Sequence, residues 1–279
     1  MTLATLAQVL QPALRDGYAV PGLVCLGWED MRAYVAAAEE ERAPVILQAG
    51  PGCRAHTPLA ILGRMFRHLA EEASVPVVAH LDHGFTLDEC RAALDAGFTS
   101  VMVDGSKLPL QQNIDLTADA AKLAHAAGAS CEGEIGYVGY AGGAASRGTD
   151  PADAARFAEA TGIDAIAISI GNLHLQLNPA GRLDLPRLRA IEAVTTAPLV
   201  IHGGSGISPA ERASLAANSR IAKINIGTEL RIAFGKALRD DLARDLDQFD
   251  RIAILKATED PVTEATRAVF RSLGSSGRV

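Results

Sequence analysis

Three histidines follow apolar segments that are typical of buried strands, and together they could hold a metal ion. They are His83 at the end of 76–84, His174 at the end of 164–174 and His202 within 197–206. Three imidazoles that reach one point can bind a divalent metal and leave a coordination position open. A single histidine in such a segment is more often a core residue, but three at equivalent strand ends favour metal ligation.

Two further polar residues share the segment of His83. Asp82 could act as a general acid or base beside a metal-bound oxygen. Alternatively, it could cap the helix that begins near Phe85 or pair with a ligating histidine. His80 lies three residues before His83, and we interpret it as a residue that orients a ligand or carboxylate. The alternative for His80 is a hydrogen-bonded core histidine.

Carboxylates interrupt two other strand segments. Glu132 and Glu134 lie within 129–135, and Asp104 ends 99–104. Carboxylates that point into a barrel are costly unless they are paired or bound to a metal. A layer of salt bridges is the alternative interpretation of this group.

Two glycine-containing loops could bind an anion. They are 203–208, with the sequence GGSGIS, and 225–230, with the sequence NIGTEL. Glycines let the backbone approach an oxyanion, and N–H groups at a helix start point toward it. Tight strand-to-helix turns would also explain the glycines, but two such loops side by side favour a phosphate site.

The chain alternates strand and helix patterns, which predicts a parallel sheet. Helical patterns such as 85–96 and 150–161 follow the strands, and Gly97, Gly128 and Gly162 occupy the positions where helices end. Eight such units predict an α/β fold: a (β/α)8 TIM barrel forming one domain over 1–279, with an additional N-terminal helix and a C-terminal helical tail. A doubly wound open sheet is the rival fold. The expected strands are 19–27, 44–49, 76–81, 99–104, 129–135, 164–169, 197–202 and 221–226, of which 129–135 has the weakest pattern.

Composition limits the partners and the compartment. The 279 residues carry a net charge of −7, which disfavours nucleic acid as the main partner, and apolar runs are too short for a membrane span. Four cysteines form no CxxC pair and are expected to be reduced thiols. With no basic leader or apolar segment at the N-terminus, these features predict a cytoplasmic protein.

The same residues carry a resemblance to a known family. The chain resembles the class II, zinc-dependent ketose-bisphosphate aldolases, the family of fructose-bisphosphate and tagatose-bisphosphate aldolases. The resemblance runs nearly end to end and implies a (β/α)8 barrel, a homodimer or homotetramer, and one Zn²⁺ per subunit. The motifs that carry it are 17-GYAV-20, 81-LDHG-84, 97-GFTSVMVDGS-106, 202-HGGSGI-207, 223-KINIGTELRIAF-234 and 270-FRSLGSSGR-278.

The resemblance also implies roles for individual residues. His83, His174 and His202 match the zinc ligands, and Asp82 matches the acid that exchanges a proton with the acceptor oxygen. Glu134 matches a glutamate near an alternative metal position, and Asp104 lies in the matching metal-side motif. Phosphate-binding positions are matched by Gly203, Ser205, Asn225 and Thr228. Arg271 matches a tail arginine that can reach the site of a neighbouring subunit. A monovalent cation near the phosphate is left open.

The sequence departs from the family pattern around the expected substrate. Val24 replaces an asparagine, Gly50 replaces a serine, and Leu175 replaces a glycine that helps to hold phosphate and a monovalent cation. The loop 136–148 lacks the glutamate that moves the substrate's α-proton and contains no carboxylate. Its tyrosines, Tyr137 and Tyr140, are the loop candidates for that proton transfer.

The expected activity is reversible retro-aldol cleavage of a ketose phosphate or related ketose to a dihydroxyacetone-phosphate-like donor and an aldehyde. The departures predict that fructose 1,6-bisphosphate is not the preferred substrate. A Schiff-base aldolase would instead need an unpaired interior lysine, for which Lys223 and Lys107 are available. A non-catalytic or regulatory sugar-phosphate-binding protein is the alternative from another class.

Overall fold

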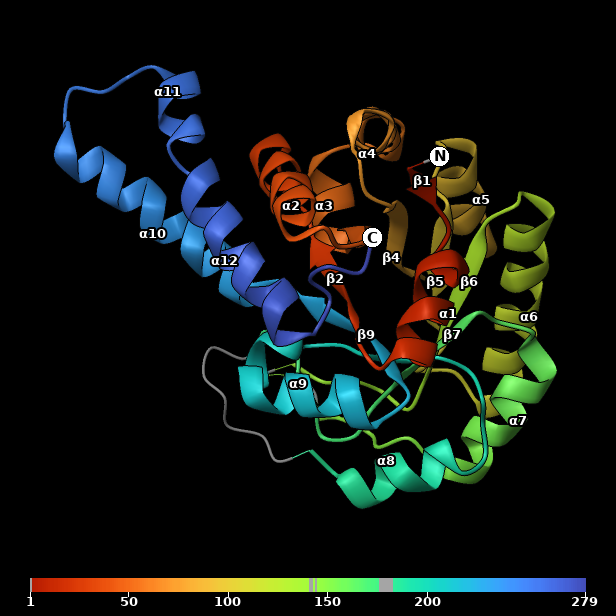
Figure 1. Ribbon diagram of the computed structural model, residues 1–279. Coiled ribbons are helices and arrows are strands. Elements are labelled where there is room, and N and C mark those ends of the chain that lie inside the picture. The colour runs from red at the N-terminus through yellow and green to blue at the C-terminus, as the bar shows by residue number, and fades with distance from the viewer. Residues whose placement is uncertain (1, 141–142, 144, 176–182) are drawn as a thin grey trace.

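The computed structural model describes residues 2–140, 143, 145–175 and 183–279. Eight parallel strands, β2 to β9, close into a barrel because β2 pairs with β9 and β4 pairs with β5. Helices surround this barrel (Figure 1). The predicted (β/α)8 barrel is therefore confirmed, and the open sheet is excluded. The barrel strands are β2 (Val20–Val24), β3 (Val45–Ala49), β4 (Val77–Gly84), β5 (Ser100–Val103), β6 (Ser130–Ile135), β7 (Ala165–Ile168), β8 (Leu199–Ile201) and β9 (Ile221–Ile226).

The helices include the predicted N-terminal helix and C-terminal tail. In Figure 1, α10 and α11 extend away from the barrel, and α12 packs back toward α2. The helices are α1 (Leu6–Asp16), α2 (Trp28–Glu41), α3 (Pro51–His56), α4 (Leu59–Glu72), α5 (Leu87–Asp95), α6 (Leu110–Ala126), α7 (Pro151–Thr161), α8 (Leu185–Glu192), the 3₁₀ turn η1 (Gly204–Gly206), α9 (Pro209–Asn218), α10 (Thr228–Arg244), α11 (Arg251–Lys256) and α12 (Glu259–Ser272).

Helix α1 contributes to the core inside the barrel. A capping box between Thr5 and Gln8 fixes its start, because each side chain accepts the other residue's backbone N–H. Its buried Leu6 and Leu10 belong to the same core cluster as Ile46 of β3 and Val78 of β4. A short strand that the sequence did not predict, β1 (Leu3–Ala4), precedes α1 and pairs with the start of β4. Apolar side chains therefore fill the α1 end of the barrel, which leaves the opposite end for polar groups.

Two predicted strand ends need correction. The strand expected over 19–27 is β2, which ends at Val24, and the strand that leads to His174 is β7, which ends at Ile168. His174 lies six residues farther along, in a loop, so it is not a strand-end residue. The weakly patterned segment 129–135 does form a strand, and every residue of β6 is buried.

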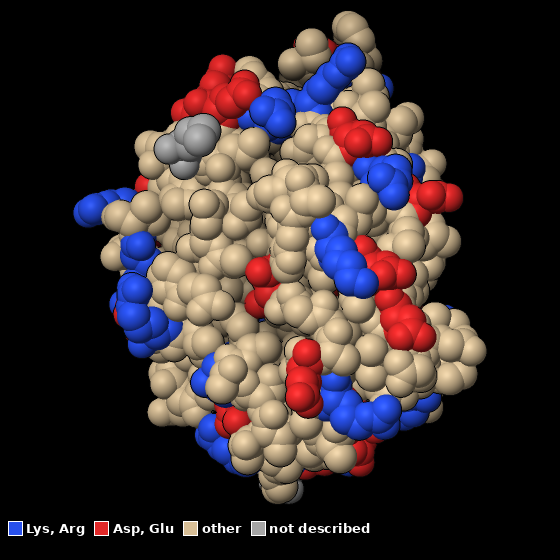
Figure 2. Space-filling model, turned by 90° about the vertical axis from the view of Figure 1, so that its right-hand side faces the viewer, with Lys and Arg blue, Asp and Glu red and all other residues tan. Residues whose placement is uncertain are grey.

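The distribution of surface charge and the state of the cysteines agree with what the composition predicts. On the face shown in Figure 2, Lys and Arg are interspersed with Asp and Glu rather than gathered into one basic patch. All four cysteines are free and buried. Within the described part of the chain, no helix is both long enough and apolar enough to cross a bilayer.

Candidate metal centre and active site

The three expected ligand histidines converge at one end of the barrel. One ring nitrogen from each of His83, His174 and His202 lies within 4.8 Å of those of the other two. The ring centroids are 4.8 Å apart for His83 and His202 and 5.8 Å apart for His83 and His174. These nitrogens are close enough to share one ion, which is the arrangement of a three-histidine metal site.

A break in the strand register brings Asp82 and His83 to the same site. Side chains of a regular strand alternate between faces, so Val78, His80 and Asp82 of β4 share the inward face. His83 would then face outward. The pairing of β4 with β5 shifts register between Leu81 and Gly84, and His83 adopts a φ of 86°. Register breaks can turn a side chain to a new direction. Here the break lets two neighbouring residues both face the metal centre.

His174 is positioned by a loop contact. Its backbone N–H donates to the carbonyl of Gly139 at 2.8 Å, and its ring stacks on Tyr140 with centroids 4.8 Å apart. Gly139 and Tyr140 belong to the loop after β6. That loop therefore orients one of the candidate ligands.

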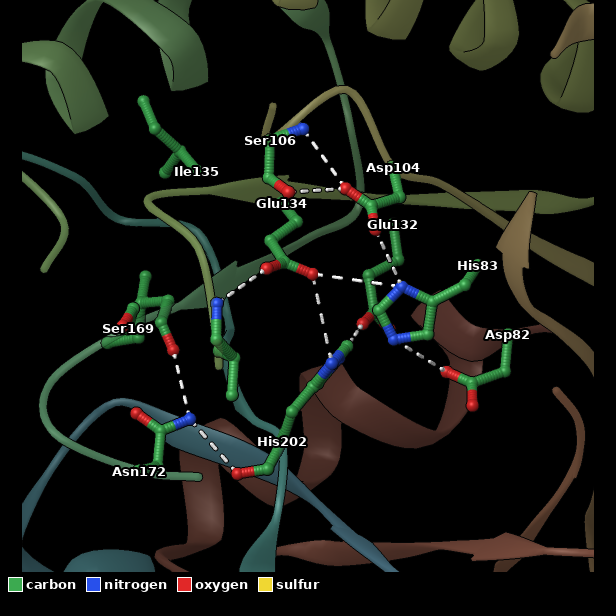
Figure 3. Close-up of polar contacts among 12 residues, drawn as sticks. Asp82, His83, Asp104, Ser106, Glu132, Glu134, Ile135, Ser169, Asn172 and His202 are labelled. Atoms are coloured by element: carbon green, nitrogen blue, oxygen red, sulfur yellow. Dashed lines mark hydrogen bonds and ion pairs between the residues drawn. The ribbon is translucent and has the colours of Figure 1, made fainter. Parts of the chain in front are cut away.

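His202 is held from both its ring and its backbone (Figure 3). Its Nε2 lies 3.2 Å from Oε1 of Glu132, and its carbonyl accepts a hydrogen bond from Nδ2 of Asn172 at 3.0 Å. Because Nε2 donates to a carboxylate, the lone pair of Nδ1 is available to the centre. This contact fixes both the tautomer and the direction of the ring.

A fully buried ionic group lies directly behind His202. Nζ of Lys223 donates to Oε2 of Glu132 at 2.7 Å, and Nε2 of His80 lies 3.6 Å from the same oxygen. His80 is also 2.8 Å from Oγ of Ser100. His80 thus contacts a carboxylate that contacts a ligand, as one of its two interpretations predicted. Lys223 is paired, which does not fit the unpaired lysine that a Schiff-base mechanism requires.

Two carboxylates approach the histidines from another side. Asp104 Oδ2 lies 3.0 Å from Nδ1 of His83, and Glu134 Oε2 lies 3.9 Å from the same nitrogen and 3.8 Å from Nδ1 of His202 (Figure 3). His83, Asp104 and Glu134 form a second group whose ligand atoms lie within 4.8 Å of one another. Burial raises the pKa of Glu134 to about 8. This group fits an alternative metal position.

Several buried polar atoms at this centre have no hydrogen-bond partner within the described part of the chain. They are His83 Nε2, His202 Nδ1, Asp82 Oδ1 and Glu134 Oε2. Such atoms are costly to leave unpaired. Burial opposes the charge on His83, but Asp82 and Asp104 raise its pKa to about 9, whereas burial and the charge of His83 lower the pKa of His174 to about 4. Imidazole nitrogens and carboxylate oxygens are the donors that divalent metals such as zinc prefer. The residues present therefore fit a divalent cation.

Asp82 faces the centre and is buried. Its Oδ1 is 3.8 Å from Nε2 of His83, and despite burial the nearby histidines lower its pKa. The side chain that caps helix α5 is that of Thr86, so the helix-cap interpretation of Asp82 is wrong. Asp82 is instead an ionised group that lines a pocket beside the metal centre.

This pocket joins the metal centre to the predicted anion loops. Gly203 has a φ of 68°, and a Cβ there would lie 2.0 Å from the carbonyl oxygen of Leu173, so only glycine fits. Oγ of Ser205 accepts the N–H groups of Gly227 and Glu229 at 3.3 Å, which joins the two loops. The lining residues are Val24, Asp82, His174, Leu175, Gly203, Ser205, Asn225, Gly227, Thr228 and Arg231.

Two of the residues that depart from the family pattern line this pocket, and a third, Gly50, is next to one of the lining residues. Val24 and Leu175 form apolar parts of its wall. Leu175 has a φ of 55°, a conformation that normally favours glycine, and its residue is 50% exposed. A Cβ at Gly50 would lie 3.3 Å from Oδ2 of Asp82, so the missing serine side chain would have been next to that carboxylate. The rest of the run that follows Leu175, residues 176–182, lies outside the described residues.

Two predicted site residues, Tyr137 and Arg271, contact residues other than the three histidines. Lys107 lies over the ring of Tyr137, 5.2 Å from its centroid, whereas Tyr140 is the tyrosine that contacts a ligand histidine. Arg271 forms ion pairs with Glu41 and Glu264. Its predicted role concerns a neighbouring subunit and stays a prediction.

Three residues at the site were not predicted as site residues, although Arg231 lies within the motif 223–234. Arg54 donates to the carbonyls of Ala49, Asp82 and His83 at 2.8, 2.6 and 3.0 Å. Asn172 donates to His202, and Arg231 lines the pocket. An arginine in 51-PGCRAH-56 and an asparagine two residues before a ligand look like ordinary loop residues. The one sequence signal that could have pointed to these residues is that each is polar and lies close in sequence to a predicted ligand or to a predicted site loop.

Comparison with known proteins identifies the family to which this chain belongs. The model of the family "Fructose-bisphosphate aldolase class-II" matches residues 4–278. A fructose-bisphosphate aldolase of Geobacillus stearothermophilus is 37% identical over 100% of this chain and 99% of its own length. A probable fructose-bisphosphate aldolase of Bacillus subtilis is 36% identical over 100% of both chains.

A solved structure agrees with the sequence comparison. The YdjI aldolase of Escherichia coli K12 superposes with a TM-score of 0.86 at 32% identity, covering 99% of this chain and 98% of its own. The similarity thus extends over the whole barrel and the tail. This chain belongs to the class-II fructose-bisphosphate aldolase family and is a carbon–carbon lyase.

Proposed function

We propose that this protein is a zinc-dependent aldolase that reversibly cleaves a ketose phosphate, or a related ketose, to a dihydroxyacetone-phosphate-like donor and an aldehyde. The observation that carries the proposal is the convergence of three histidine nitrogens, within 4.8 Å of one another, beside a buried carboxylate. His83, His174 and His202 would hold one Zn²⁺ per subunit. Glu134 and Asp104, together with His83, would offer an alternative position. When bound, zinc polarises a carbonyl and stabilises the negative charge that develops during cleavage.

Asp82 is proposed to move the hydroxyl proton. In the cleavage direction its carboxylate accepts the proton of the hydroxyl whose carbon becomes the aldehyde, and in synthesis it returns that proton. The low pKa of Asp82 keeps it in the basic form that cleavage needs. Its unpartnered Oδ1 faces the same centre as the histidines, which supports this role.

A second proton must reach the donor carbon after the carbon–carbon bond breaks. Of the two loop tyrosines, Tyr140 is the better candidate because its ring stacks on His174. Burial raises the pKa of Tyr140, so its hydroxyl remains protonated and able to donate. Tyr137 lies beside Lys107 and is the weaker candidate of the pair.

The phosphate of the donor is proposed to bind where the two loops meet. Gly203, Ser205, Asn225 and Thr228 line the same pocket as Asp82, and Thr228 begins helix α10. Backbone N–H groups at a helix start favour an anion. Leu175 replaces a glycine that in the family helps to hold a monovalent cation, so that cation is not included in the proposal.

The wall of the pocket supports a substrate other than fructose 1,6-bisphosphate. Val24 and Gly50 stand where the family has polar side chains, and Leu175 adds bulk where the family has a glycine whose backbone helps to hold phosphate. A substrate hydroxyl that finds no hydrogen-bonding partner in the pocket loses the hydrogen bond that it makes in water, which weakens binding of that substrate. We therefore propose a related ketose phosphate as the preferred substrate.

The wider properties follow from the same assignment. We propose one barrel domain over 1–279, a homodimer or homotetramer in which Arg271 reaches a neighbouring site, and a cytoplasmic location. The four free buried thiols are consistent with a reducing compartment.

Metal analysis combined with a cleavage assay tests the proposal. The purified protein should contain one zinc per chain, lose activity with a chelator and regain it with zinc. Ketose phosphates that differ in length and stereochemistry should be compared by kcat/KM. Tight binding of these sugars without turnover would instead identify a non-catalytic binding protein, and turnover that survives complete metal removal would contradict the metal mechanism.

A further inference from the structure

Of the three candidate zinc ligands, His174 has the least support from the barrel itself. His83 belongs to β4 and His202 directly follows β8, whereas His174 lies in the loop after β7. The ring of His83 is held by Asp104 at 3.0 Å, and that of His202 by Glu132 at 3.2 Å. Across residues 2–140, 143, 145–175 and 183–279, the ring of His174 has no carboxylate partner. Its orientation must therefore depend on other contacts.

The loop after β6 supplies those contacts. The backbone carbonyl of Gly139 accepts the N–H of His174 at 2.8 Å, and the ring of Tyr140 stacks on the imidazole. Tyr140 and His174 also pair as a short parallel bridge. The position of the His174 ring thus depends on the position of residues 139 and 140.

A single hydroxyl joins this part of the loop to its neighbour. Oγ of Ser146 accepts the backbone N–H of Gly139 at 2.9 Å and donates to the backbone carbonyl of Asn172 at 3.3 Å. Gly139 belongs to the loop after β6 and Asn172 to the loop after β7. A serine that only completed its own turn would form hydrogen bonds within that turn. Ser146 also forms one to the loop that carries His174.

Asn172 offers a fixed point for this contact. The residue is 3% exposed, and its side chain accepts the N–H of Ile170 at 2.8 Å and donates to the carbonyl of His202 at 3.0 Å (Figure 3). Ser146 therefore attaches the loop after β6 to a buried residue that already holds a second candidate ligand.

The base of the loop is closed directly beside Ser146. The backbone groups of Tyr137 and Arg147 exchange two hydrogen bonds, at 2.8 and 2.9 Å. The guanidinium of Arg147 donates to the carbonyl of Ser106 at 2.5 Å. These contacts hold the two ends of the loop but are not made to His174. The hydroxyl of Ser146 links the closed base to Gly139, and through Gly139 to the ligand.

We propose that Ser146 is a positioning residue whose hydroxyl holds the loop after β6 where Gly139 and Tyr140 orient His174 toward the metal centre. The inference rests on the proposed zinc-dependent function and adds to it the residue that prepares the third ligand. Groups that orient a metal ligand change the metal affinity when they are removed. By linkage, a zinc ion held by His174 should in turn stabilise the attachment of the loop.

The test compares Ser146→Ala and Ser146→Thr with a matched control, Ser219→Ala. Ser219 is also half-buried, and its hydroxyl also accepts one N–H, from Ile221, and donates to one carbonyl, that of Leu215. It precedes β9, at the opposite end of the barrel from the metal centre. The two alanine variants therefore lose equivalent hydrogen bonds, but only Ser146 contacts the loops that position His174.

Three measurements follow the effect, two of them without metal. Competition with a chelator gives the zinc affinity. Proton NMR of the metal-free protein follows the imidazole of His174, whose signals are assigned by their loss in His174→Gln and are shifted by the stacked ring of Tyr140. Trypsin cleavage after Arg147, the only lysine or arginine in 136–148, reports how often the loop detaches.

Ser146→Ala should lower the zinc affinity roughly 3–10-fold, the scale of one neutral hydrogen bond. The His174 signals should move toward their unstacked positions, and cleavage after Arg147 should become faster by a similar factor. Zinc should slow this cleavage in the wild type and slow it less in Ser146→Ala. Ser146→Thr keeps the hydroxyl and should stay within about twofold of wild type in zinc affinity and cleavage. Ser219→Ala should change neither, nor the His174 signals.

Wild-type zinc affinity and unmoved His174 signals in Ser146→Ala would overturn the positioning role. An equal loss in Ser219→Ala, or a Ser146→Thr variant no better than Ser146→Ala, would also overturn it, because the effect would then not depend on this hydroxyl. A wild-type protein that binds no zinc would contradict the proposed function instead. The His174 signals and cleavage rates of the metal-free proteins would then still decide whether Ser146 positions the ring.

Discussion

Nζ of Lys223 lies 2.7 Å from Oε2 of Glu132, and both side chains are completely buried inside the barrel. The second oxygen of Glu132 contacts Nε2 of His202 at 3.2 Å. Lys223 therefore holds the carboxylate of Glu132 in place from one side while its other oxygen accepts a hydrogen bond from His202. This contact directs the other ring nitrogen of His202 to the candidate metal centre.

Breaking this pair should affect both folding and metal binding. Lys223→Met leaves Glu132 buried without its cation, and we expect the free energy of unfolding to fall by roughly 3–5 kcal/mol. Zinc affinity should fall roughly 10–100-fold, because the orientation of His202 is less fixed. Chemical denaturation and zinc competition with a chelator measure the two effects. Lys236→Met removes an exposed pair with Asp240 and should change stability by less than about 1 kcal/mol. Unchanged zinc affinity in Lys223→Met would restrict the pair to a packing role.

Each ligand histidine should be necessary for the metal. His83→Ala, His174→Ala and His202→Ala should each lose zinc and activity while the barrel remains folded, as elemental analysis and circular dichroism can show. His125→Ala is the control, because His125 pairs with Asp164 at the surface. Any of the three variants that retains one zinc per chain and full turnover would remove that residue from the ligand set.

Asp82→Ala should separate proton transfer from metal binding. The variant should retain zinc, because the three histidines remain, and its cleavage rate should fall by roughly 10²–10⁴, the scale of positioned acid–base catalysis. The rate and its pH profile are measured at saturating substrate. A normal rate with a normal profile would mean that another group carries the proton.

Leu175 tests whether the pocket wall sets the substrate. Leu175→Gly removes the side chain and relieves the positive φ of 55°, whereas Leu175→Ala removes only bulk. Both should raise kcat/KM on fructose 1,6-bisphosphate relative to other ketose phosphates, and Leu175→Gly should raise it more if backbone strain also matters. Wild-type enzyme that already prefers fructose 1,6-bisphosphate would show that the wall does not exclude this sugar.

The thiols should be unreactive in the folded protein. Burial raises the pKa of Cys53 to about 11 and that of Cys90 to about 12. Because only the thiolate reacts, a rise of about two units lowers the reactive fraction at pH 8 roughly 100-fold, and the folded structure also blocks access. A thiol reagent at pH 8 should therefore label all four cysteines only after denaturation. Rapid labelling of the native protein would contradict the burial of whichever thiol reacts.

The barrel was predictable because its signals are local. Alternating strand and helix patterns gave the eight strands, and Gly97, Gly128 and Gly162 do adopt the positive φ of helix ends. The carboxylates of β6 weakened its pattern because their partners, such as Lys223, lie on other strands and have no local signal. The strand β1 is only two residues long, too short for any periodicity to show.

The site was predictable by residue type but not in its geometry. Strand alternation alone would place Asp82 and His83 on opposite faces, and only the register break in β4 brings them together. His174 was expected at a strand end, but a loop contact with Tyr140 positions it. Arg54 and Asn172 act through backbone carbonyls, whose location depends on the complete fold.

The three carbonyls held by Arg54 have a consequence for engineering. One guanidinium joins the end of β3, which leads into Gly50, to the two residues of β4 that are proposed to move a proton and to bind the metal. The wall at Gly50 and the Asp82–His83 pair therefore share one support. A mutant library aimed at new acceptor aldehydes can randomise position 50 and keep a working metal centre, provided that Arg54 stays fixed. A library that also varies Arg54 should yield mostly variants that bind metal poorly, however suitable their pockets.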